Sequence, residues 1–307
     1  MKTILLSNPV QLKDLTGKYH IEDYTLVCSS IGYDDHVYFL FAQHVPERIH
    51  GMFVDTRANT GYTVIRGSVD WNNERLIADE YIDLGVHEMN YHMIQPIDQD
   101  ILLLGARAGL QKNGAYENNA CIVNTQGEVL DAFCLGDGIE DCIVTKDGRI
   151  ITGYFDEGVF GDSLYGSKGL VIWNRSGQPI WLNEKYDIYD CYAMNIDEQE
   201  NLWFYFYSDF DLVRTDFQKD LVYHPEVSGM NKFLLTKGNQ LMCDGGYNKH
   251  GQFCKMDILH DRLENVETVN IEFEGKVLLL KDAVFRSSKA VFRDNEDRFY
   301  FKDVVWL

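Results

Sequence analysis

The sequence has few basic residues for its length and contains no long apolar run. It carries 28 Lys and Arg against 48 Asp and Glu, which gives a formal net charge of −20. Such a surface repels phosphate backbones and anionic lipid headgroups, so we expect no nucleic-acid partner and no membrane partner. No stretch approaches the roughly 18 apolar residues of a membrane-spanning helix. The apolar run from Ile4 to Leu6 is too short for a signal-peptide core, and we expect none.

The sequence also lacks the cysteine spacing of a zinc site or a disulfide framework. Its 7 cysteines are odd in number and never spaced C-x-x-C. Most of them lie inside apolar, strand-like runs such as Cys142-Ile143-Val144. We therefore expect reduced thiols in the core of a cytoplasmic protein. The cysteines are Cys28, Cys121, Cys134, Cys142, Cys191, Cys243 and Cys254.

What the chain does contain is an internal repeat. Residues 141–144 read as a strand, Lys146-Asp147-Gly148 as a turn, and residues 150–154 as a second strand, which together indicate a β-hairpin. A second hairpin follows, with strands at 169–173 and 178–182. Four such strands are the content of one β-propeller blade.

The same unit recurs along the chain, and one more blade is shared between the two ends. We predict strands at 24–31, 36–42, 61–70 and 74–84; at 91–97, 101–106, 121–124 and 128–134; at 190–197, 202–207, 211–215 and 220–224; and at 231–236, 240–243, 252–258 and 266–273. A short helix is an alternative for residues 74–82. The carboxyl end supplies strands at 289–293 and 298–301, and the amino end supplies strands at 3–6 and 10–15, which would complete a sixth blade.

The predicted fold is therefore all-β: a single domain over residues 1–307, built as a six-bladed β-propeller of four-stranded blades. Strands from the two ends of the chain share one blade and close it. Seven blades remain an alternative, because the long first unit could contain two. The continuously apolar strand 202–207 fits a blade that is covered on both faces by its neighbours.

Three segments resemble a family of bacterial six-bladed propellers that carries no assigned activity. They are Asp137-Gly138-Ile139-Glu140-Asp141, Asp147-Gly148-Arg149-Ile150 and the segment 153–161, which reads GYFDEGVFG. The hairpins also resemble, more distantly, propellers of the NHL and SMP-30/gluconolactonase types. These resemblances imply the fold and supply no mechanism, because one fold serves many functions.

Several short motifs have simpler readings than the chemistry that they suggest. His87 and His92 are five residues apart, whereas the zinc-protease motif needs histidines four apart on one helical face. Residues 161–164 spell the G-D-S-L of an esterase family, but we place Ser163 in a loop between blade strands. The acidic turns 197–201 and 294–297 do not have the spacing of an EF-hand, and we expect them to be solvated hairpin turns.

The longest insertions predict which end of the blades carries the function. Residues 43–60, 107–119, 155–168 and 244–251 all fall between the second and third strands of a blade, and these loops open on the same face as the connections between blades. We expect a ligand-binding site at the tunnel mouth on this face. Its candidate ligand-binding residues are Asn90, His92, Tyr154, Asp156, Glu157, Asp209 and Tyr247.

The function that we expect is binding of a small polar molecule or a protein partner at this mouth. The alternative is an enzyme, a metal-dependent hydrolase or lactonase resembling the SMP-30/gluconolactonase group. A divalent cation, Ca²⁺ or Mg²⁺, would then polarise the substrate and lower the pKa of bound water. The candidate metal ligands of that alternative are Glu140, Asp141, Asp190 and Asn231.

Overall fold

The computed structural model describes residues 2–47, 56–249 and 251–306. Its contacts divide the chain into two compact units. Unit 1 comprises Met1–Asp14, Val69–Ile77 and Asp190–Leu307, and unit 2 comprises Leu15–Ser68 and Ala78–Tyr189. In the described part of the chain, no helix is both long enough and apolar enough to cross a membrane.

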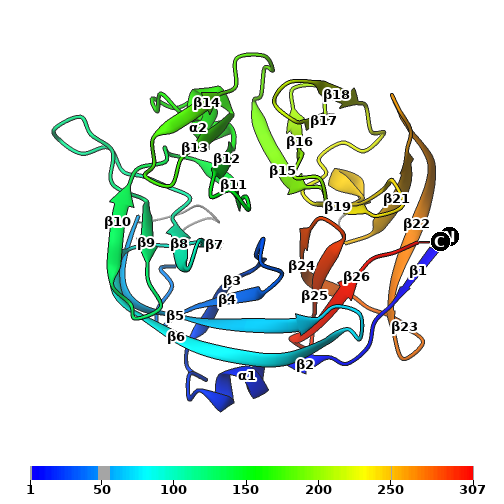
Figure 1. Cartoon of the computed structure of the whole chain (residues 1–307), viewed down its shortest axis with the longest axis horizontal. Helices are drawn as coiled ribbons and strands as arrows, with labels where there is room; N and C mark the ends of the chain where they lie inside the picture. Colours follow the sequence, from blue (N-terminus) through cyan, green and yellow to red (C-terminus); the bar gives the residue numbers. More distant parts are fainter. Residues whose placement is uncertain (1, 48–55, 250, 307) are drawn as a thin grey trace. The chain divides into compact units, whose positions relative to one another are not determined.

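Unit 2 contains three antiparallel four-stranded sheets (Figure 1). Each sheet follows the chain order of a meander, so every strand pairs with the strand that precedes or follows it. The first sheet contains β3 (Thr25–Ile31), β4 (Val37–Ala42), β5 (Arg57–Asp70) and β6 (Arg75–Met89). The second contains β7 (Met93–Ile97), β8 (Asp100–Leu104), β9 (Ala120–Val123) and β10 (Val129–Phe133). The third contains β11 (Ile139–Val144), β12 (Ile150–Tyr154), β13 (Leu170–Trp173) and β14 (Pro179–Leu182).

Unit 1 contains the other three sheets. The fourth sheet contains β15 (Asp190–Ile196), β16 (Leu202–Tyr207), β17 (Asp211–Thr215) and β18 (Asp220–Tyr223). The fifth contains β19 (Phe233–Thr236), β20 (Gln240–Asp244), β21 (Phe253–Ile258) and β22 (Leu263–Phe273), with β1 (Lys2–Leu5) and β23 (Lys276–Val277) beside β22. The sixth contains β24 (Leu280–Arg286), β25 (Lys289–Asp294), β26 (Arg298–Asp303) and β2 (Val10–Gln11).

These six sheets are the blades of a six-bladed β-propeller, as the repeat predicts, and the seven-blade alternative is wrong for the described residues. Strand β2 pairs with β26, so the amino-terminal segment does share a blade with the carboxyl end. Two details of that blade differ from the prediction. Strand β1 runs parallel to β22 in the fifth blade, and the segment Leu12–Lys18 forms the helix α1. The fourth strand of the sixth blade is therefore β24, a strand that the sequence pattern did not predict.

Residues 75–82 of the segment 74–82 form a strand, and the helical alternative is wrong. The strand lies in β6, which with β5 forms a long hairpin whose tip, Val69–Ile77, belongs to unit 1 (Figure 1). Within unit 1, the Ser7 hydroxyl donates a hydrogen bond to the Glu74 carboxylate over 2.7 Å, and Lys302 forms an ion pair with the same carboxylate. Glu74 at the tip of this hairpin thus contacts residues near both ends of the chain, Ser7 and Lys302.

One turn design recurs in five hairpins. Its first residue accepts, through a side-chain oxygen, the backbone N–H of the residue four positions later, and its fourth residue has a positive φ. Glycine occupies that fourth position in three of the turns, since it adopts positive φ without steric cost. These turns begin at Asn124, Thr145, Asn174, Asp197 and Asp294.

The first acid of each acidic turn is buried, contrary to the expectation of a solvated turn, whereas Glu198 and Glu296 in the same turns are exposed as expected. Asp197 is 9% exposed and Asp294 only 1%. The Trp203 indole N–H donates to Asp197 Oδ2 over 3.0 Å, and the Tyr300 hydroxyl donates to Asp294 Oδ2 over 3.1 Å. In both cases an aromatic residue six positions later donates to the carboxylate, so these acids stabilise the fold.

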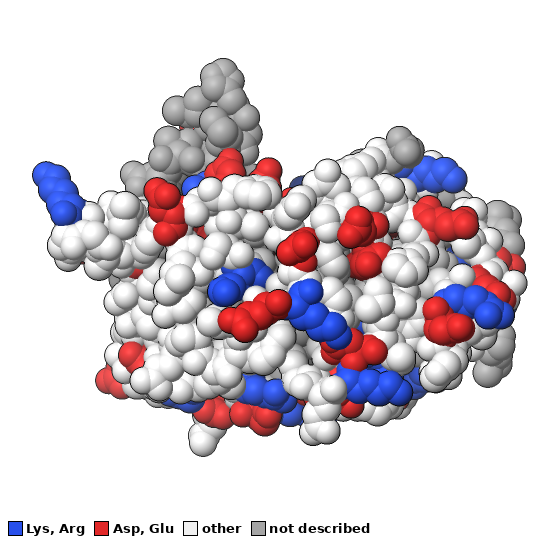
Figure 2. Space-filling view, turned by 90° about the horizontal axis from the view of Figure 1, so that it is seen from above, with Lys and Arg blue, Asp and Glu red and all other residues white. Residues whose placement is uncertain are grey.

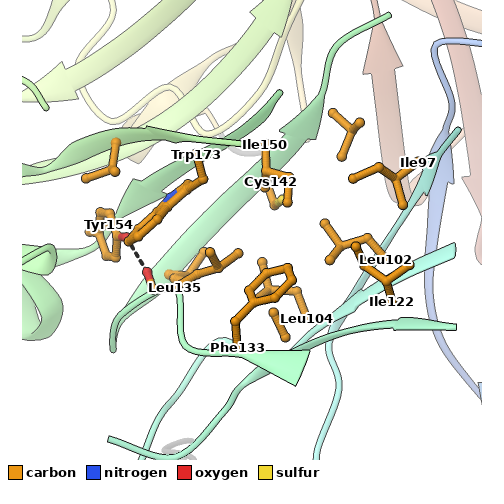
Figure 3. Packing of buried hydrophobic residues seen from close by; sticks show 14 of the residues in the cluster. Ile97, Leu102, Leu104, Ile122, Phe133, Leu135, Cys142, Ile150, Tyr154 and Trp173 are labelled. Carbon is orange, nitrogen blue, oxygen red and sulfur yellow. Dashed lines mark hydrogen bonds between the residues drawn. The ribbon is translucent and has the colours of Figure 1, made fainter. Parts of the chain in front are cut away.

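The core of unit 2 lies between its blades (Figure 3). Aliphatic side chains of β7 to β9 pack against Cys142, Ile150 and Trp173 of the third blade. All seven cysteines are free thiols, as expected, and four of them are buried.

Candidate functional site

The predicted site residues divide between the two units. Asn90, His92, Glu140, Asp141, Tyr154, Asp156 and Glu157 belong to unit 2. Asp190, Asp209, Asn231 and Tyr247 belong to unit 1. Part of the insertion 43–60, namely residues 48–55, lies outside the described residues.

In unit 2, Arg107 connects three loop segments through hydrogen bonds and ion pairs. Arg107, in the loop after β8, donates to both carboxylate oxygens of Asp137 over 2.9 and 3.0 Å. It also forms an ion pair with Glu157 at the start of the helix α2 (Asp156–Val159). Ala108 N–H donates to Asp137 Oδ1 over 2.7 Å. Glu157 is therefore a structural ion-pair partner in this arrangement.

Several glycines in and near the segments 137–141 and 153–161 lie where two stretches of backbone approach each other closely. A Cβ on Gly138 would lie 2.3 Å from Gly158 Cα, and a Cβ on Gly166 would lie 2.3 Å from the Gly158 carbonyl oxygen. Only glycine permits such close backbone approach. The segments around Gly138 and Gly158 therefore act first as a packing device that fixes the loop conformation.

Three carboxylates lie close in sequence to Gly138 and Gly158, and we call them the acidic group. They are Glu140 and Asp141 on β11, and Asp156 on α2. Burial, followed by repulsion from Asp141 and Asp156, raises the pKa of Glu140 to about 7. The Glu140 side chain is nevertheless exposed to solvent at its surface. Each added negative charge in this group therefore costs free energy, which an incoming cation would offset.

Three other predicted residues of unit 2 serve the fold. Tyr154 is fully buried, and its hydroxyl donates to the Leu135 carbonyl in the core (Figure 3), so the candidate site does not include it. Asn90 is 6% exposed, and its N–H donates to the Thr56 carbonyl over 2.7 Å. His92 Nδ1 accepts the Ala106 N–H over 3.2 Å, which orders the start of the long loop.

In unit 1, the long-loop ends of the fourth and fifth blades carry an aromatic cluster, which we define as Tyr192, Tyr205, Tyr207, Phe210 and Tyr247. Phe210 lies at its centre, with ring centroids 5.1 Å from Tyr207, 6.0 Å from Tyr247 and 6.3 Å from Tyr192. Tyr207 and Tyr247 are 42% and 52% exposed. Large aromatic side chains with this exposure are typical of binding surfaces.

The cluster is held in place by backbone features. Phe210 has φ 61°, a left-handed conformation that is rare for an aromatic residue and is often found at functional positions. A Cβ on Gly229 would lie 2.4 Å from the Tyr247 ring, so only glycine lets that ring lie against the backbone. The Tyr192 and Tyr247 hydroxyls are hydrogen-bonded to each other. Burial, that hydrogen bond and the charge of Asp190 raise the pKa of Tyr192 well above its usual value.

The predicted acids of unit 1 lie on the segments that carry this cluster. Asp190 on β15 is the cross-strand partner of Tyr207 on β16. Asp209 precedes Phe210 in the connection between β16 and β17 and accepts the Ser208 hydroxyl over 3.2 Å. Asn231 lines a separate pocket of about 140 Å³ with Lys232 and Asp282. The aromatic cluster thus carries negative charge on two of its own segments.

The other motifs of the sequence take no part in these groups. Ser163 is 3% exposed and accepts the Gly166 N–H over 3.4 Å, so its hydroxyl is not presented to a substrate. His87 is buried, burial lowers its pKa, and its ring bonds to the Leu84 carbonyl. Over the described ranges, no group of three or more His, Cys, Asp or Glu side chains is arranged to hold a metal ion.

Sequence reasoning missed Phe210 and Tyr207. The continuously apolar run Leu202–Tyr207 predicts burial throughout, whereas Tyr207 at its end is exposed. The available signal was a large apolar residue, Phe210, between two acids in a tight connection; in the structure it is partly buried and packs against the core of unit 1.

No family model matches the chain, and no curated protein matches it. Solved propellers do resemble it. A chain of the mitotic checkpoint complex matches with TM-score 0.54 and 8% identity, over 93% of this chain and 79% of that one. A virginiamycin B lyase from Staphylococcus aureus matches with TM-score 0.51 and 9% identity, over 97% and 99% of the two chains.

A gluconolactonase from Xanthomonas campestris is also similar, with TM-score 0.46, 11% identity and coverage of 97% and 98%. At these identities the likeness shows the fold alone. The class that the structure defines is the six-bladed β-propeller, and the chain is similar in fold to propellers of diverse function.

Proposed function

We propose that this protein is a binding module whose aromatic cluster holds a small organic cation. The observation that carries the proposal is the combination of partly exposed aromatic rings with carboxylates on the same segments of unit 1. A cation over an aromatic face gains about 0.5–1 kcal/mol at exposed sites and more where it is desolvated. Carboxylates beside the rings add charge complementarity.

The cluster supports binding without a large rearrangement. The ring of Phe210, whose backbone is left-handed, lies near the rings of the four tyrosines of the cluster. The absence of a side chain at Gly229 leaves space for the Tyr247 ring. Rings fixed in this way lose little conformational freedom when a ligand arrives, which preserves affinity.

Charge favours the same class of ligand. The net charge of −20 concentrates small cations near the surface and repels anions. Within unit 1, Asp190 and Asp209 add negative charge on the segments that carry the rings. An amine or a quaternary ammonium ion would be stabilised by both features.

The test compares tetramethylammonium with tert-butanol, a neutral molecule of similar size. We expect tetramethylammonium to raise the melting temperature at constant ionic strength and tert-butanol to have no such effect. Tyr247→Leu should weaken binding roughly two- to five-fold, the value of one cation–π contact. Tyr33→Leu serves as the matched control, because Tyr33 lies in the short connection between β3 and β4 and its hydroxyl donates to the Asp98 carbonyl.

Two results would contradict the proposal. One is equal stabilisation by tetramethylammonium and tert-butanol, and the other is unchanged binding in Tyr247→Leu. Metal content is measured on the same protein, purified without chelators. A stoichiometric Ca²⁺ or Mg²⁺ ion would favour the metal-dependent hydrolase instead.

A further inference from the structure

A pocket of about 280 Å³ opens in unit 1 at the opposite ends of the strands from the aromatic cluster. Strand β15 begins at Asp190, beside the cluster, and ends at Ile196, immediately before Asp197 of the pocket wall. The connections that follow β15, β19 and β21 all contribute to the wall. We call it the turn-side pocket.

One wall residue has an unsatisfied polar group. Thr236 is 8% exposed, and its Oγ1 is buried without a hydrogen-bond partner. A buried hydroxyl without a partner is unfavourable, so most such groups in native proteins are bonded. Thr236 lines the pocket, but its Oγ1 is itself shielded from solvent, so its side chain must rotate to another rotamer to bring this hydroxyl to a ligand.

The polar wall offers donors and two carboxylates: the buried one, Asp197, is already occupied, and the exposed one, Glu198, lies 3.7 Å from the Lys237 ammonium. Asp197 accepts hydrogen bonds from Asn201, Trp203 and Arg214. Burial opposes its ionisation, but these hydrogen bonds outweigh burial and hold the pKa of Asp197 below its usual value. The carboxylate is therefore charged and saturated with donors.

The donors that remain surround the open space. The Arg214 Nε–H donates a hydrogen bond to Asp197, while the two terminal NH₂ groups of Arg214 donate to no described residue. The Lys237 ammonium, with one carboxylate partner at 2.9 Å and another at 3.7 Å, has three N–H groups. The His260 ring makes no hydrogen bond within the described residues. Guanidinium, ammonium and hydroxyl donors together select an acceptor with negative charge.

The remaining wall is apolar and limits the size of the ligand. Leu221, Ile258 and Leu259 line it, and Leu259 is 38% exposed. The volume of about 280 Å³ lies near the lower end of ligand pockets, which span roughly 300–1,000 Å³. Polyanions are excluded by the overall charge of −20.

We propose that the turn-side pocket binds a small organic monoanion, a carboxylate on a compact apolar body, whose oxygens accept hydrogen bonds from Thr236, Lys237 and Arg214. This site is separate from the aromatic cluster and binds the opposite charge. The protein would therefore recognise two classes of small molecule at the two ends of the same blades.

The test uses benzoate as the probe and benzamide as its neutral counterpart, with binding measured by ligand-observed NMR at constant ionic strength. We expect saturable binding of benzoate and at least ~10-fold weaker binding of benzamide. Thr236→Val and Lys237→Met should each weaken benzoate binding ~10-fold or more, as loss of a hydrogen bond to a charged group predicts. Lys237→Met changes an exposed side chain, so it tests the site without disturbing the core.

Thr63→Val is the matched control. The Thr63 hydroxyl is also buried without a partner, but Thr63 does not line this pocket. Both threonine variants should keep or raise the melting temperature, and only Thr236→Val should lose benzoate binding. Equal affinity for benzoate and benzamide, or unchanged benzoate binding in Thr236→Val, would overturn the proposal. A lower melting temperature for Thr236→Val would also overturn it, because the hydroxyl would then have a partner in the protein.

Discussion

Glu200 occupies the fourth position of a recurrent turn, where three of the other turns have glycine. Its φ is 62°, close to the 68° of Gly177 and the 78° of Gly148. The left-handed conformation costs a residue with a Cβ about 1–2 kcal/mol, and part of that cost is offset by the greater flexibility of unfolded glycine. We predict that Glu200→Gly raises the free energy of unfolding by about 0.5–1 kcal/mol, measured by urea denaturation.

The reverse substitution is the control for this prediction. A Cβ on Gly148 would meet only one atom, Asp98 Oδ1 at 3.8 Å, so space is not the obstacle there. Gly148→Ala should therefore lower the free energy of unfolding by about 1 kcal/mol through the backbone alone. If both variants match the parent protein, the turn conformation has no energetic cost and the prediction is wrong.

Glu140 gives a prediction that depends on pH. Its pKa is raised from the usual 4.5 to about 7, so the folded state binds this proton more tightly than the unfolded state. Stability is therefore unaffected by Glu140 below about pH 4.5 and decreases as pH rises through 7. Glu140→Gln should match the parent near pH 4 and exceed it at pH 8. We expect a gain of less than about 1 kcal/mol, since the side chain is exposed and solvent screens its charge.

The control for Glu140 is Glu226→Gln, which removes a carboxylate that makes no hydrogen bond or ion pair with the described residues. Unfolding free energies at pH 4, 6 and 8 are compared for both variants. A Glu140→Gln protein less stable than its parent at pH 8 would show that the ionised carboxylate stabilises the fold.

At the scale of elements, the repeat predicted most strands because turn residues separate short apolar runs at regular intervals. Strand β24 was missed because its sequence, Leu280–Arg286, mixes charged and apolar residues, and its burial is partial. The segment Leu12–Lys18 forms α1, where Leu15 is buried, so tertiary contacts decided between strand and helix. Strand partners across the chain, such as β22 for β1, cannot be read from local pattern.

The candidate site was predictable only in part, for related reasons. The order of strands in each blade predicted which acids lie in loops, but it did not predict which side chains are buried. Tyr154 is the last residue of its strand, where an exposed side chain is equally common, yet it lies in the core. The aromatic cluster depends on the backbone turn at Phe210 and on the contact of Tyr247 with Gly229. Neither contact leaves a periodic signal in the sequence. That residues 1–307 form a single domain stays a prediction.

Strand β1 offers a test of the fifth blade with two neighbouring residues. Ile4 is 3% exposed and packs in the core of unit 1, whereas Leu5 is 62% exposed. We predict that Ile4→Ala lowers the free energy of unfolding by about 2–4 kcal/mol through lost burial and a residual cavity. Leu5→Ala should change it by less than about 0.5 kcal/mol. Equal effects of the two variants in thermal denaturation would contradict the position of β1.

At the scale of the whole molecule, charge is the dominant feature. Figure 2 shows acidic side chains distributed over one face, with basic side chains beside several of them. Ion pairs such as Arg175 with Asp98 and Asp100 are among the local partners. Even if each of the 28 basic residues paired with one of the 48 acids, a net charge of −20 would remain. The unpaired carboxylates would therefore still repel one another.

Salt should therefore stabilise the protein. The Debye length falls from about 30 Å at 0.01 M to about 8 Å at 0.15 M, which screens repulsion between distant carboxylates more than contact between close pairs. We predict that the melting temperature rises by a few degrees between 10 and ~150 mM NaCl. A steady decrease would show that the surface ion pairs outweigh the net charge.

The same titration separates general screening from a specific divalent site. CaCl₂ and MgCl₂ are compared with NaCl at equal ionic strength, so that screening by the bulk salt is matched. If no cation site exists, the three melting curves should nearly coincide. A site occupied at 100 times its dissociation constant would add about 2.7 kcal/mol to the free energy of unfolding. Because the proposed ligand is an organic cation held by aromatic rings, we predict the first outcome. A selective rise with one divalent ion, lost in Glu140→Gln or in Asp190→Asn, would instead identify the carboxylates that bind it.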